Sequence, residues 1–249
     1  MTPECIADYI TDCCIHNWPC VHYDDCNHDN GHDNIQVDSN ENCDSISTSP
    51  VESKINRSSK KKRKRQVRLN GHRRITGIIN PQSGFVLDLF CGCGGNSISF
   101  AKKICNIISV DIDESKLSLL QHNSRIYDAN MNIQCICADA YMFLQKNINT
   151  LKHKVDVILL APPWGDDYVT CTDSYDIKTS FPCGDGFELL KLAIQITPYV
   201  IYVLPRSVHM HHISQMVTKV CSHLQYAVEN VHINSKLKMI LVFFSPAHL

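Results

Sequence analysis

The sequence predicts an α/β fold built on a mostly parallel sheet. Between residues 85 and 244, short apolar runs alternate with segments of helical pattern, an order typical of strands joined by crossover helices. The run at 155–160 is apolar except for Asp156, as expected of a central strand covered by helices on both faces. A glycine-rich turn follows the first run, which indicates a ligand site at the carboxyl ends of the strands.

Six runs are predicted as strands and four segments as helices. The strands are residues 85–90, 107–110, 133–137, 155–160, 199–204 and 238–244. The helices are residues 97–104, 115–126, 187–196 and 213–224. The strands are short and apolar, and polar or glycine-containing turns separate them from the helices.

The N-terminal third differs from this pattern. Residues 1–53 hold eleven acidic residues and no Lys or Arg, whereas residues 54–74 hold eleven Lys and Arg and no acidic residue. Residues 11–80 show no persistent apolar period, so we expect a disordered insertion there. The predicted organisation is a short N-terminal segment of the domain at 1–10, the insertion at 11–80, and the main part of the domain at 81–249.

The chain has fourteen cysteines, but a disulfide-rich secreted protein is not expected. The first ten residues include Glu4 and Asp8 and lack the apolar core of a signal peptide. No apolar run is long enough to cross a membrane. Cys135 and Cys137 lie in an apolar run, where a reduced cysteine acts as a small hydrophobic residue. These features favour a reducing compartment.

Two parts of the insertion have alternative interpretations. Zinc ligands are available at Cys13, Cys14, Cys20, His22, Cys26, His28 and His32. Their spacing fits no standard zinc motif, so we favour an unstructured insertion over a metal site. Residues 60–65 are six consecutive basic residues, for which we favour a nuclear import signal over an RNA-contacting arm or a solvated charge run.

The first strand ends in the glycine-rich turn DLFCGCGGN at residues 88–96. Glycines allow a tight turn and a close approach to a ligand, and the bare amides of the following helix favour polar or anionic groups. A phosphate-binding P-loop is excluded because Lys102 lies too far along the helix. A dinucleotide motif needs glycine where Ser97 stands. A purely structural turn stays open.

Acidic residues end the second and third strands. Asp111 follows the glycines by about 20 residues, which suits a ribose diol. Asp113 is predicted to cap the next helix. Asp139 ends the third strand and could accept a hydrogen bond from an adenine amine, although a loop aspartate that bonds its own backbone is the alternative.

The fourth strand ends in Ala161-Pro162-Pro163-Trp164-Gly165. Two prolines hold the backbone extended and leave nearby carbonyl groups free of helix or sheet bonds. Such carbonyls could accept hydrogens from a planar exocyclic amine and aim its nitrogen at a methyl donor. Trp164 adds a stacking face. A plain loop is the alternative.

Together these segments resemble the trimethylguanosine synthase family, which converts the 7-methylguanosine cap of small nuclear and nucleolar RNAs to the 2,2,7-trimethyl form. The similar segments are residues 88–96, 111–113, 137–139, 162–165, 167–168, 175–179, 185–188, 204–206 and 234–238. The resemblance therefore covers residues 85–244 almost throughout. Thr2-Pro3-Glu4 also resembles a family segment that normally lies shortly before the first strand.

The resemblance implies a Rossmann-like class I S-adenosylmethionine-dependent methyltransferase fold, with a seven-stranded, mostly parallel sheet flanked by helices. The residues implied to hold S-adenosylmethionine are Asp88, Phe90, Gly92, Gly94, Asn96, Asp111 and Asp139. The implied catalytic segment is Pro162, Pro163 and Trp164. Trp164 would stack on the charged 7-methylguanine, with a cation–π contribution of roughly 1–2 kcal/mol. Arg206 would meet the cap phosphates, although a plain surface arginine is the alternative. No metal is implied.

The implied partner is 7-methylguanosine-capped RNA, bound by a monomer without membrane association. We expect a nuclear location, with the nucleolus and the cytoplasm left open. Catalysis is expected to depend on alignment of amine, methyl and sulfonium rather than on a strong base.

The sequence departs from the family in two relevant ways. Ala161 stands where the family has serine, and the family usually carries a helical segment before Thr2-Pro3-Glu4. These departures keep a non-catalytic cap-binding or RNA-binding homologue open. An enzyme that methylates another base amine, such as adenine in ribosomal RNA, is a third interpretation, which Trp164 and Arg206 disfavour.

Overall fold

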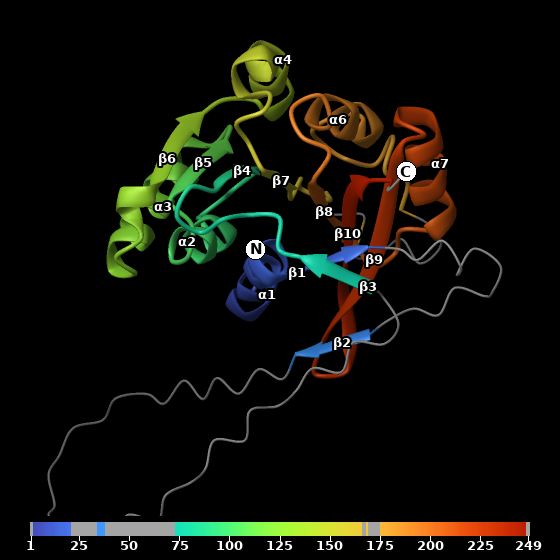
Figure 1. Ribbon diagram of the computed structural model, residues 1–249, viewed down its shortest axis with the longest axis horizontal. Helices are drawn as coiled ribbons and strands as arrows, with labels where there is room; N and C mark the ends of the chain where they lie inside the picture. The colour runs from blue at the N-terminus through green and yellow to red at the C-terminus, as the bar shows by residue number, and fades with distance from the viewer. Residues whose placement is uncertain (1, 21–33, 38–72, 166–167, 169–174, 248–249) are drawn as a thin grey trace, which may run out of the picture.

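The computed structural model describes residues 2–20, 34–37, 73–165, 168 and 175–247. One eight-stranded sheet has the strand order β2-β9-β10-β8-β7-β4-β5-β6 (Figure 1). Its strands are β2 (Asn34–Val37), β4 (Phe85–Leu89), β5 (Asn106–Asp111), β6 (Ile133–Cys137), β7 (Val157–Leu160), β8 (Val200–Pro205), β9 (Leu224–Ile233) and β10 (Lys236–Pro246). The helices are α1 (Glu4–His16), α2 (Gly95–Ala101), α3 (Glu114–Ile126), α4 (Ala140–Leu151), α6 (Gly186–Ala193) and α7 (Met210–Val220), with a 3-10 turn, η2, at Asn130–Asn132.

The central strands are parallel, as predicted. β4 pairs with β5 and β7, β5 pairs with β6, and β7 pairs with β8, all in parallel. β10 enters antiparallel to β8 and carries β9 beside it. The seven strands from β6 to β9 confirm the predicted sheet, and β2 adds an eighth strand parallel to β9 at the edge. The strand order reverses around β4 and β7, so their carboxyl ends open a crevice.

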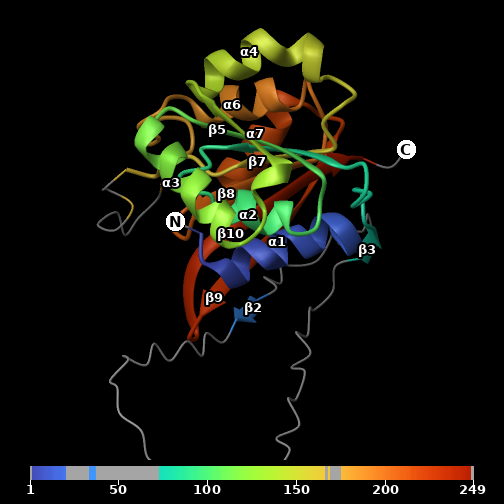
Figure 2. The ribbon, with the colours of Figure 1, turned by 90° about the vertical axis from the view of Figure 1, so that its left-hand side faces the viewer.

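Helices cover both faces of the sheet (Figures 1 and 2). Successive strand residues point to opposite faces, so Leu87 and Ile158 pack with α4, α6 and α7, while Val86 and Val157 pack with α1 and α2. All four side chains are fully buried. Each such burial contributes roughly 1.5–3 kcal/mol, which explains why these strands are apolar along their whole length.

Two elements of the sheet region were not predicted. One is α4, which starts after the Asp139 cap. The other is β9, which begins at Leu224, the last residue of the predicted helix 213–224; the helix α7 ends earlier, at Val220. β9 carries Glu229 at a position that is 1% exposed, which breaks the apolar pattern of a strand. The Tyr9 hydroxyl donates to Glu229 Oε2 at 2.5 Å, a contact that no local pattern reveals.

The prediction that all of residues 11–80 are disordered is wrong for the parts that the structure describes. α1 continues to His16, and β1 (Asn17–Cys20) pairs with β3 (Arg73–Thr76). Trp18 is fully buried and makes edge contacts with Tyr199 and Phe243 at ring distances of 5.5 and 5.4 Å. The N-terminal segment of the domain therefore extends beyond the predicted residues 1–10 to Cys20, and Arg73–Thr76 also belongs to the fold.

The structure places Cys13 and Cys14, two of the available zinc ligands, in the hydrophobic core. Both side chains are buried on α1 with Ile6 and Ile10, at the spacing of an apolar helix stripe. The structure places them among hydrophobic residues, and no metal-ligating cluster occurs among the described side chains. The other candidate ligands, His22, Cys26, His28 and His32, lie outside the described residues, as does the basic run at 60–65; the side chain of Cys20 is not described.

α1 packs directly beside α2. The Ser99 hydroxyl donates to Asp8 Oδ1 at 2.5 Å and lies 3.0 Å from the Thr11 hydroxyl. Exposed ion pairs join Glu4 to Lys102 and Asp12 to Lys103 at 3.2 and 2.7 Å. These contacts fix the start of α1 next to the glycine-rich turn. Within the described ranges, no helix is both long enough and apolar enough to span a bilayer.

Candidate active site

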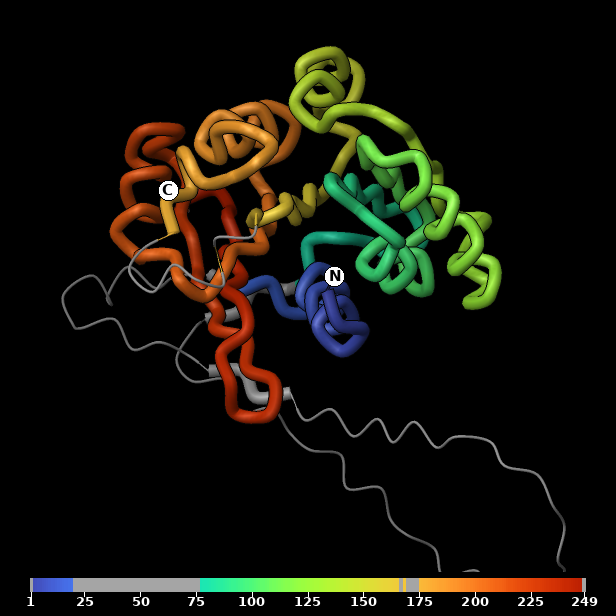
Figure 3. Tube along the Cα trace, turned by 180° about the vertical axis from the view of Figure 1, so that it is seen from behind, coloured from blue at the N-terminus to red at the C-terminus, as the bar shows by residue number. Residues whose placement is uncertain are grey.

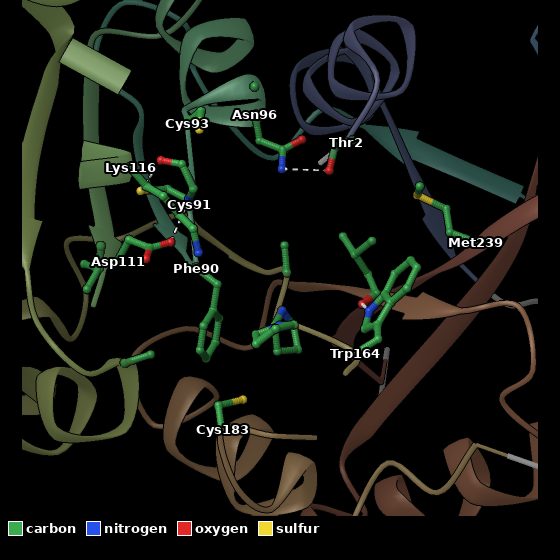
Figure 4. Close-up of a pocket in the computed structure, with 18 of the residues that line it drawn as sticks. Thr2, Phe90, Cys91, Cys93, Asn96, Asp111, Lys116, Trp164, Cys183 and Met239 are labelled. Atoms are coloured by element: carbon green, nitrogen blue, oxygen red, sulfur yellow. Dashed lines mark hydrogen bonds between the residues drawn. The ribbon is translucent and has the colours of Figure 1, made fainter. Parts of the chain in front are cut away.

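A cavity of about 1240 Å³ opens beyond the carboxyl ends of the central parallel strands. Figure 4 shows its lining, with Asp111 and Phe90 on one side and Trp164 and Met239 on the other. The cavity lies at the reversal of strand order, where open α/β sheets bind ligands.

Positive φ angles shape the turn after β4. Phe90, Gly92 and Gly94 have φ values of 63°, 54° and 91°. A Cβ atom on Gly94 would lie 2.5 Å from Leu120 Cγ, so only glycine fits this position. Phe90 and Gly92 line the cavity, whereas Gly94 does not. Gly94 therefore shapes the turn, and the contact with a cofactor that the resemblance implied for it stays a prediction.

Asp88 lies beneath the turn and does not line the cavity. Its side chain is fully buried, and its Oδ2 accepts a hydrogen bond from the Ser97 hydroxyl at 2.5 Å. Ser109 donates in turn to Ser97 at 2.8 Å. Burial raises the pKa of Asp88 to about 7, against the hydrogen bond from Ser97, while the charge of Asp111 raises it further. Asp88 therefore supports the turn from below, and its implied contact with a cofactor stays a prediction.

Asp111 holds the rim of the cavity at the end of β5. Its Oδ2 accepts from the Gly92 N–H at 2.8 Å, and its Oδ1 accepts from the Asp113 N–H at 3.0 Å. Each carboxylate oxygen retains a second lone pair for a ligand. Asp113 caps α3 by accepting from the Ser115 and Lys116 amides, which confirms the predicted cap.

Asp139 lies between the end of β6 and the start of α4. It lines the cavity, and its Oδ1 also caps α4 by accepting from the Met142 N–H at 3.0 Å. The helix after Asp139 was missed because the sequence position was treated only as a strand end. A strand-end aspartate followed by helix-forming residues was the available signal.

Thr2 and Pro3 also line the cavity, although no role was predicted for them. The Asn96 side-chain amide donates to the Thr2 hydroxyl at 3.2 Å (Figure 4). A Cβ atom on Gly95 would lie 3.2 Å from the Thr2 carbonyl oxygen, so the N-terminal segment packs closely over the turn. The available signal was Thr2-Pro3-Glu4 itself, which resembles a family segment.

The segment after β7 forms the floor between the two sides. Ala161, Pro162 and Pro163 line the cavity, and the Ala161 N–H donates to the Leu89 carbonyl at 3.3 Å. This bond ties the segment to the end of β4. The position of the prolines is therefore set by the parallel sheet rather than by the loop alone.

Three contacts fix Trp164 on the far side of the cavity. Its indole N–H donates to the Val203 carbonyl at 3.2 Å, and its own carbonyl accepts from the Tyr175 hydroxyl at 3.0 Å. Tyr168 packs edge-on against the indole with a ring distance of 5.2 Å. Tyr175 is itself held by a backbone bond to Ser207. The indole is thus preorganised by segments that follow β7 and β8.

Two cations border the cavity near Trp164. The ladder between β8 and β10 pairs Pro205 with Met239, so Arg206 and Lys238 stand at the next position of the two strands. The β9–β10 register shifts between Leu237 and Met239, a bulge that re-aims the side chain between them. Arg206 and Lys238 are both exposed and line the cavity. Lys238 was not predicted, because a bulge depends on the register of two strands.

No ion pair with a described acidic residue neutralises either cation. Two positive charges at one border of the cavity favour an anionic ligand there. Burial raises the pKa of the Cys91 and Cys183 thiols, which also line the cavity. These thiols therefore stay protonated at neutral pH and are poor nucleophiles.

The structure brings together most of the predicted site residues. Those that line the one cavity are Phe90, Gly92, Asn96, Asp111, Asp139, Pro162, Pro163, Trp164 and Arg206. Asp88 and Gly94 do not reach it. Carboxylates and glycine amides therefore gather on one side, and an aromatic face with two cations gathers on the other.

Residues 83–247 match the family described as RNA cap guanine-N2 methyltransferase. The chain is 33% identical over 138 residues to a trimethylguanosine synthase of Schizosaccharomyces pombe, covering 53% of this chain and 54% of that protein. It is 28% identical over 140 residues to the Saccharomyces cerevisiae trimethylguanosine synthase, covering 56% and 44%. The chain thus matches about half the length of these curated relatives.

Among solved structures, a SAM-dependent methyltransferase from Agrobacterium tumefaciens aligns with a TM-score of 0.49 at 17% identity, covering 66% of this chain and 56% of that one. An O-methyltransferase from Bacillus cereus aligns with a TM-score of 0.47 at 9% identity, covering 64% and 73%.

Proposed function

This chain belongs to the RNA cap guanine-N2 methyltransferase family, and from that premise we propose that it transfers methyl groups to the exocyclic amine of a 7-methylguanosine cap. The observation that carries the proposal is the position of Trp164. Its fixed indole lines the same cavity as the glycine-rich turn, and Pro162 and Pro163 line that cavity too. A flat cationic base on this indole would lie between the prolines and the two border cations.

The family and the fold imply S-adenosylmethionine as cofactor, and the residues of the turn fit it. Asp111 can accept from the ribose hydroxyls with its remaining lone pairs. A Cβ atom on Gly92 would meet nothing within 4 Å, so a ligand can approach the backbone there. Phe90 adds an apolar wall, and Asp139 can accept from the adenine amine. When bound, S-adenosylmethionine supplies an electrophilic methyl group.

Recognition of the charged base is assigned to Trp164. The 7-methyl group gives guanine a positive charge, and stacking on indole gains roughly 1–2 kcal/mol from cation–π attraction. Ordinary base stacking contributes about 1–3 kcal/mol more. The bonds to Val203 and Tyr175 hold the ring in place before binding, which lowers the entropy cost of recognition.

The prolines orient the methyl acceptor. Pro162 and Pro163 have no N–H to donate, and their segment is anchored on Leu89. Their backbone carbonyls accept the amine hydrogens, so that the nitrogen faces the methyl donor. Holding two reactants in line in this way lowers the entropic part of the barrier. The amine loses its proton after transfer, and no cysteine of the cavity takes part.

Arg206 and Lys238 bind the cap phosphates. Each of the two cations is attracted to the negative charge of a triphosphate that lies against this border. The planar guanidinium of Arg206 suits two phosphate oxygens at once, while Lys238 acts as a point charge. The triphosphate linkage is a feature of capped RNA that an internal base lacks, which favours a cap over an adenine within ribosomal RNA.

The proposal is tested by incubating the chain with 7-methylguanosine-capped RNA and labelled S-adenosylmethionine, and following methyl transfer by mass. Trp164→Ala should lower the rate at subsaturating RNA about 100-fold, since about 3 kcal/mol of stacking is lost. Trp164→Phe keeps a ring and should retain part of the activity. Binding of S-adenosylmethionine should be unchanged in both variants.

Other outcomes separate the remaining interpretations. A wild-type chain that binds 7-methylguanosine triphosphate more tightly than guanosine triphosphate, without turnover, would be a non-catalytic cap-binding protein. Equal binding of the two nucleotides would instead favour methylation of another base. Mass analysis also shows whether one or two methyl groups are added.

Small nuclear and nucleolar RNAs as substrates, a monomeric state and a nuclear location belong to the same proposal. They rest on the family and on the basic run at residues 60–65, and fusion of residues 54–74 to a fluorescent protein tests the location.

A further inference from the structure

The end of the β9–β10 hairpin projects from the body of the domain (Figures 1 and 3), and β2 pairs with β9 along it. Pairing with β8 covers only Met239 to Phe244, so residues 236–238 continue beyond that strand. Asn234 and Ser235 form the turn with φ values of 51° and 61°, the conformation of a tight two-residue hairpin. The hairpin end is therefore a short arm of defined shape next to the cavity.

The charges on this arm are unbalanced. Residues 224–246 hold Lys236, Lys238 and one acidic residue, Glu229. Glu229 is buried and bonded to Tyr9, so it does not offset the lysines at the surface. Lys236 is exposed, and no described acidic residue forms an ion pair with it.

Lys236 lies on the face of the hairpin that borders the cavity. Its partner in the β9–β10 register is Ile233, which lines the cavity. Residues directly opposite in a ladder share one face of the sheet. Arg206, Lys238 and Lys236 therefore follow one another from the end of β8 towards the hairpin turn.

From this arrangement we propose that the hairpin end, defined by Asn234, Ser235 and Lys236, binds the ribose-phosphate chain of the RNA just beyond the cap. The proposal rests on the proposed function. Arg206 and Lys238 take the triphosphate, and Lys236 receives the next phosphates as the single strand leaves the cavity. Phosphate contacts of this kind position an RNA without reading its sequence.

The test compares wild type, Lys236→Ala and Lys236→Arg in binding to 7-methylguanosine triphosphate and to a capped ten-nucleotide single-stranded RNA. Lys146→Ala on α4 is the matched control, since Lys146 is exposed and does not line the cavity. Lys236→Ala should bind the capped RNA about 5-fold more weakly at 0.1 M salt and reduce the salt slope by about 0.7, as for one lost phosphate contact. Lys236→Arg and Lys146→Ala should behave as wild type.

Binding of 7-methylguanosine triphosphate should be the same in all four proteins. If wild type prefers this nucleotide to guanosine triphosphate but Lys236→Ala binds capped RNA as tightly as wild type, the hairpin inference fails while the proposed function stands. An equal loss in Lys146→Ala would also overturn it, because the effect would then be one of net charge. A wild-type chain without any cap preference would overturn the proposed function itself.

Discussion

The two sides of the cavity are built in different ways. On the cofactor side, the functional groups follow β4, β5 and β6 directly, and Asp111 holds Gly92 through a single hydrogen bond of 2.8 Å between neighbouring strand ends. On the substrate side, Trp164, Arg206 and Lys238 come from three separate segments. Trp164 depends on Val203 and on Tyr175, which lies beyond a stretch that the structure does not describe.

This difference has a chemical counterpart. The cofactor side offers carboxylates and backbone amides, which suit hydroxyl groups, an amine and a sulfonium. The substrate side offers an indole and cations that no acidic residue of the described ranges pairs with, which suits a charged base with phosphates. The two sides should therefore bind their ligands independently: a substitution on one side should lower the affinity for one ligand and leave the affinity for the other unchanged.

Asp111→Asn should have the largest effect among the substitutions that test whether the two sides bind their ligands independently. The substitution places an amide N–H₂ against either the Gly92 or the Asp113 N–H, and it removes a charged acceptor. Hydrogen bonds to charged groups contribute about 1.5–3 kcal/mol, so S-adenosylmethionine should bind about 10- to 100-fold more weakly. Calorimetric titration with S-adenosylmethionine measures this loss.

The second ligand provides the control for Asp111→Asn. Binding of 7-methylguanosine triphosphate, followed by quenching of tryptophan fluorescence, should remain at the wild-type value. Asp113→Asn is the matched variant, because Asp113 caps α3 at the same strand end without lining the cavity, and it should bind both ligands normally. A parallel loss of cap binding in Asp111→Asn would show that the two sides are coupled.

The cofactor side could be predicted from sequence because its groups lie at fixed distances along the chain. A glycine turn after a strand, an acid about 20 residues later and another strand-end acid specify positions on a parallel sheet before any contact is known. What sequence could not separate was direct contact from support. Asp88 and Gly94 belong to the same turn as Gly92. Their neighbours, Ser97 for Asp88 and Leu120 for Gly94, are brought there by tertiary packing and cannot be read from the turn itself.

The substrate side and the N-terminal segment were predicted less well, for physical reasons. Lys238 reaches the cavity through a bulge, which depends on strand register. Cys13 and Cys14 were assigned to a disordered insertion, although they complete an apolar stripe on α1. Trp18 completes the core only by meeting Tyr199 and Phe243, more than 180 positions away in the chain.

Asp88 belongs to the cofactor side of the cavity, which it supports from a fully buried position. Its pKa is raised to about 7 in the folded protein, mainly by burial, against about 3.9 for an exposed aspartate. The folded state therefore binds the proton more tightly, and stability falls as pH rises towards the folded pKa. Between pH 6 and 8 this group should lower the free energy of unfolding by about 1 kcal/mol.

Urea unfolding of wild type and Asp88→Asn at pH 6 and pH 8 measures this contribution. Asp88→Asn cannot ionise, so its stability should change less across the interval, whatever its stability at either pH. All other titrating groups are shared by the two proteins and cancel in the difference. Identical pH dependence in both proteins would mean that Asp88 stays ionised despite its burial.

Ala161 lies where the two sides meet, and Ala161→Ser tests their boundary with the smallest expected effect. Its backbone is fixed by the bond to Leu89 at 3.3 Å, so a serine hydroxyl would enter the cavity at a defined place next to the prolines. One additional hydrogen bond to the acceptor amine contributes about 1 kcal/mol, which corresponds to about a 5-fold higher kcat if it forms mainly in the transition state. KM for capped RNA and the affinity for S-adenosylmethionine should stay unchanged.

Ala161→Cys is the control, because cysteine has nearly the same volume as serine but forms only weak hydrogen bonds, and this variant should match wild type. If serine slows transfer while cysteine does not, the hydroxyl competes with the proline carbonyls for the amine, and alignment in this chain depends on the backbone alone.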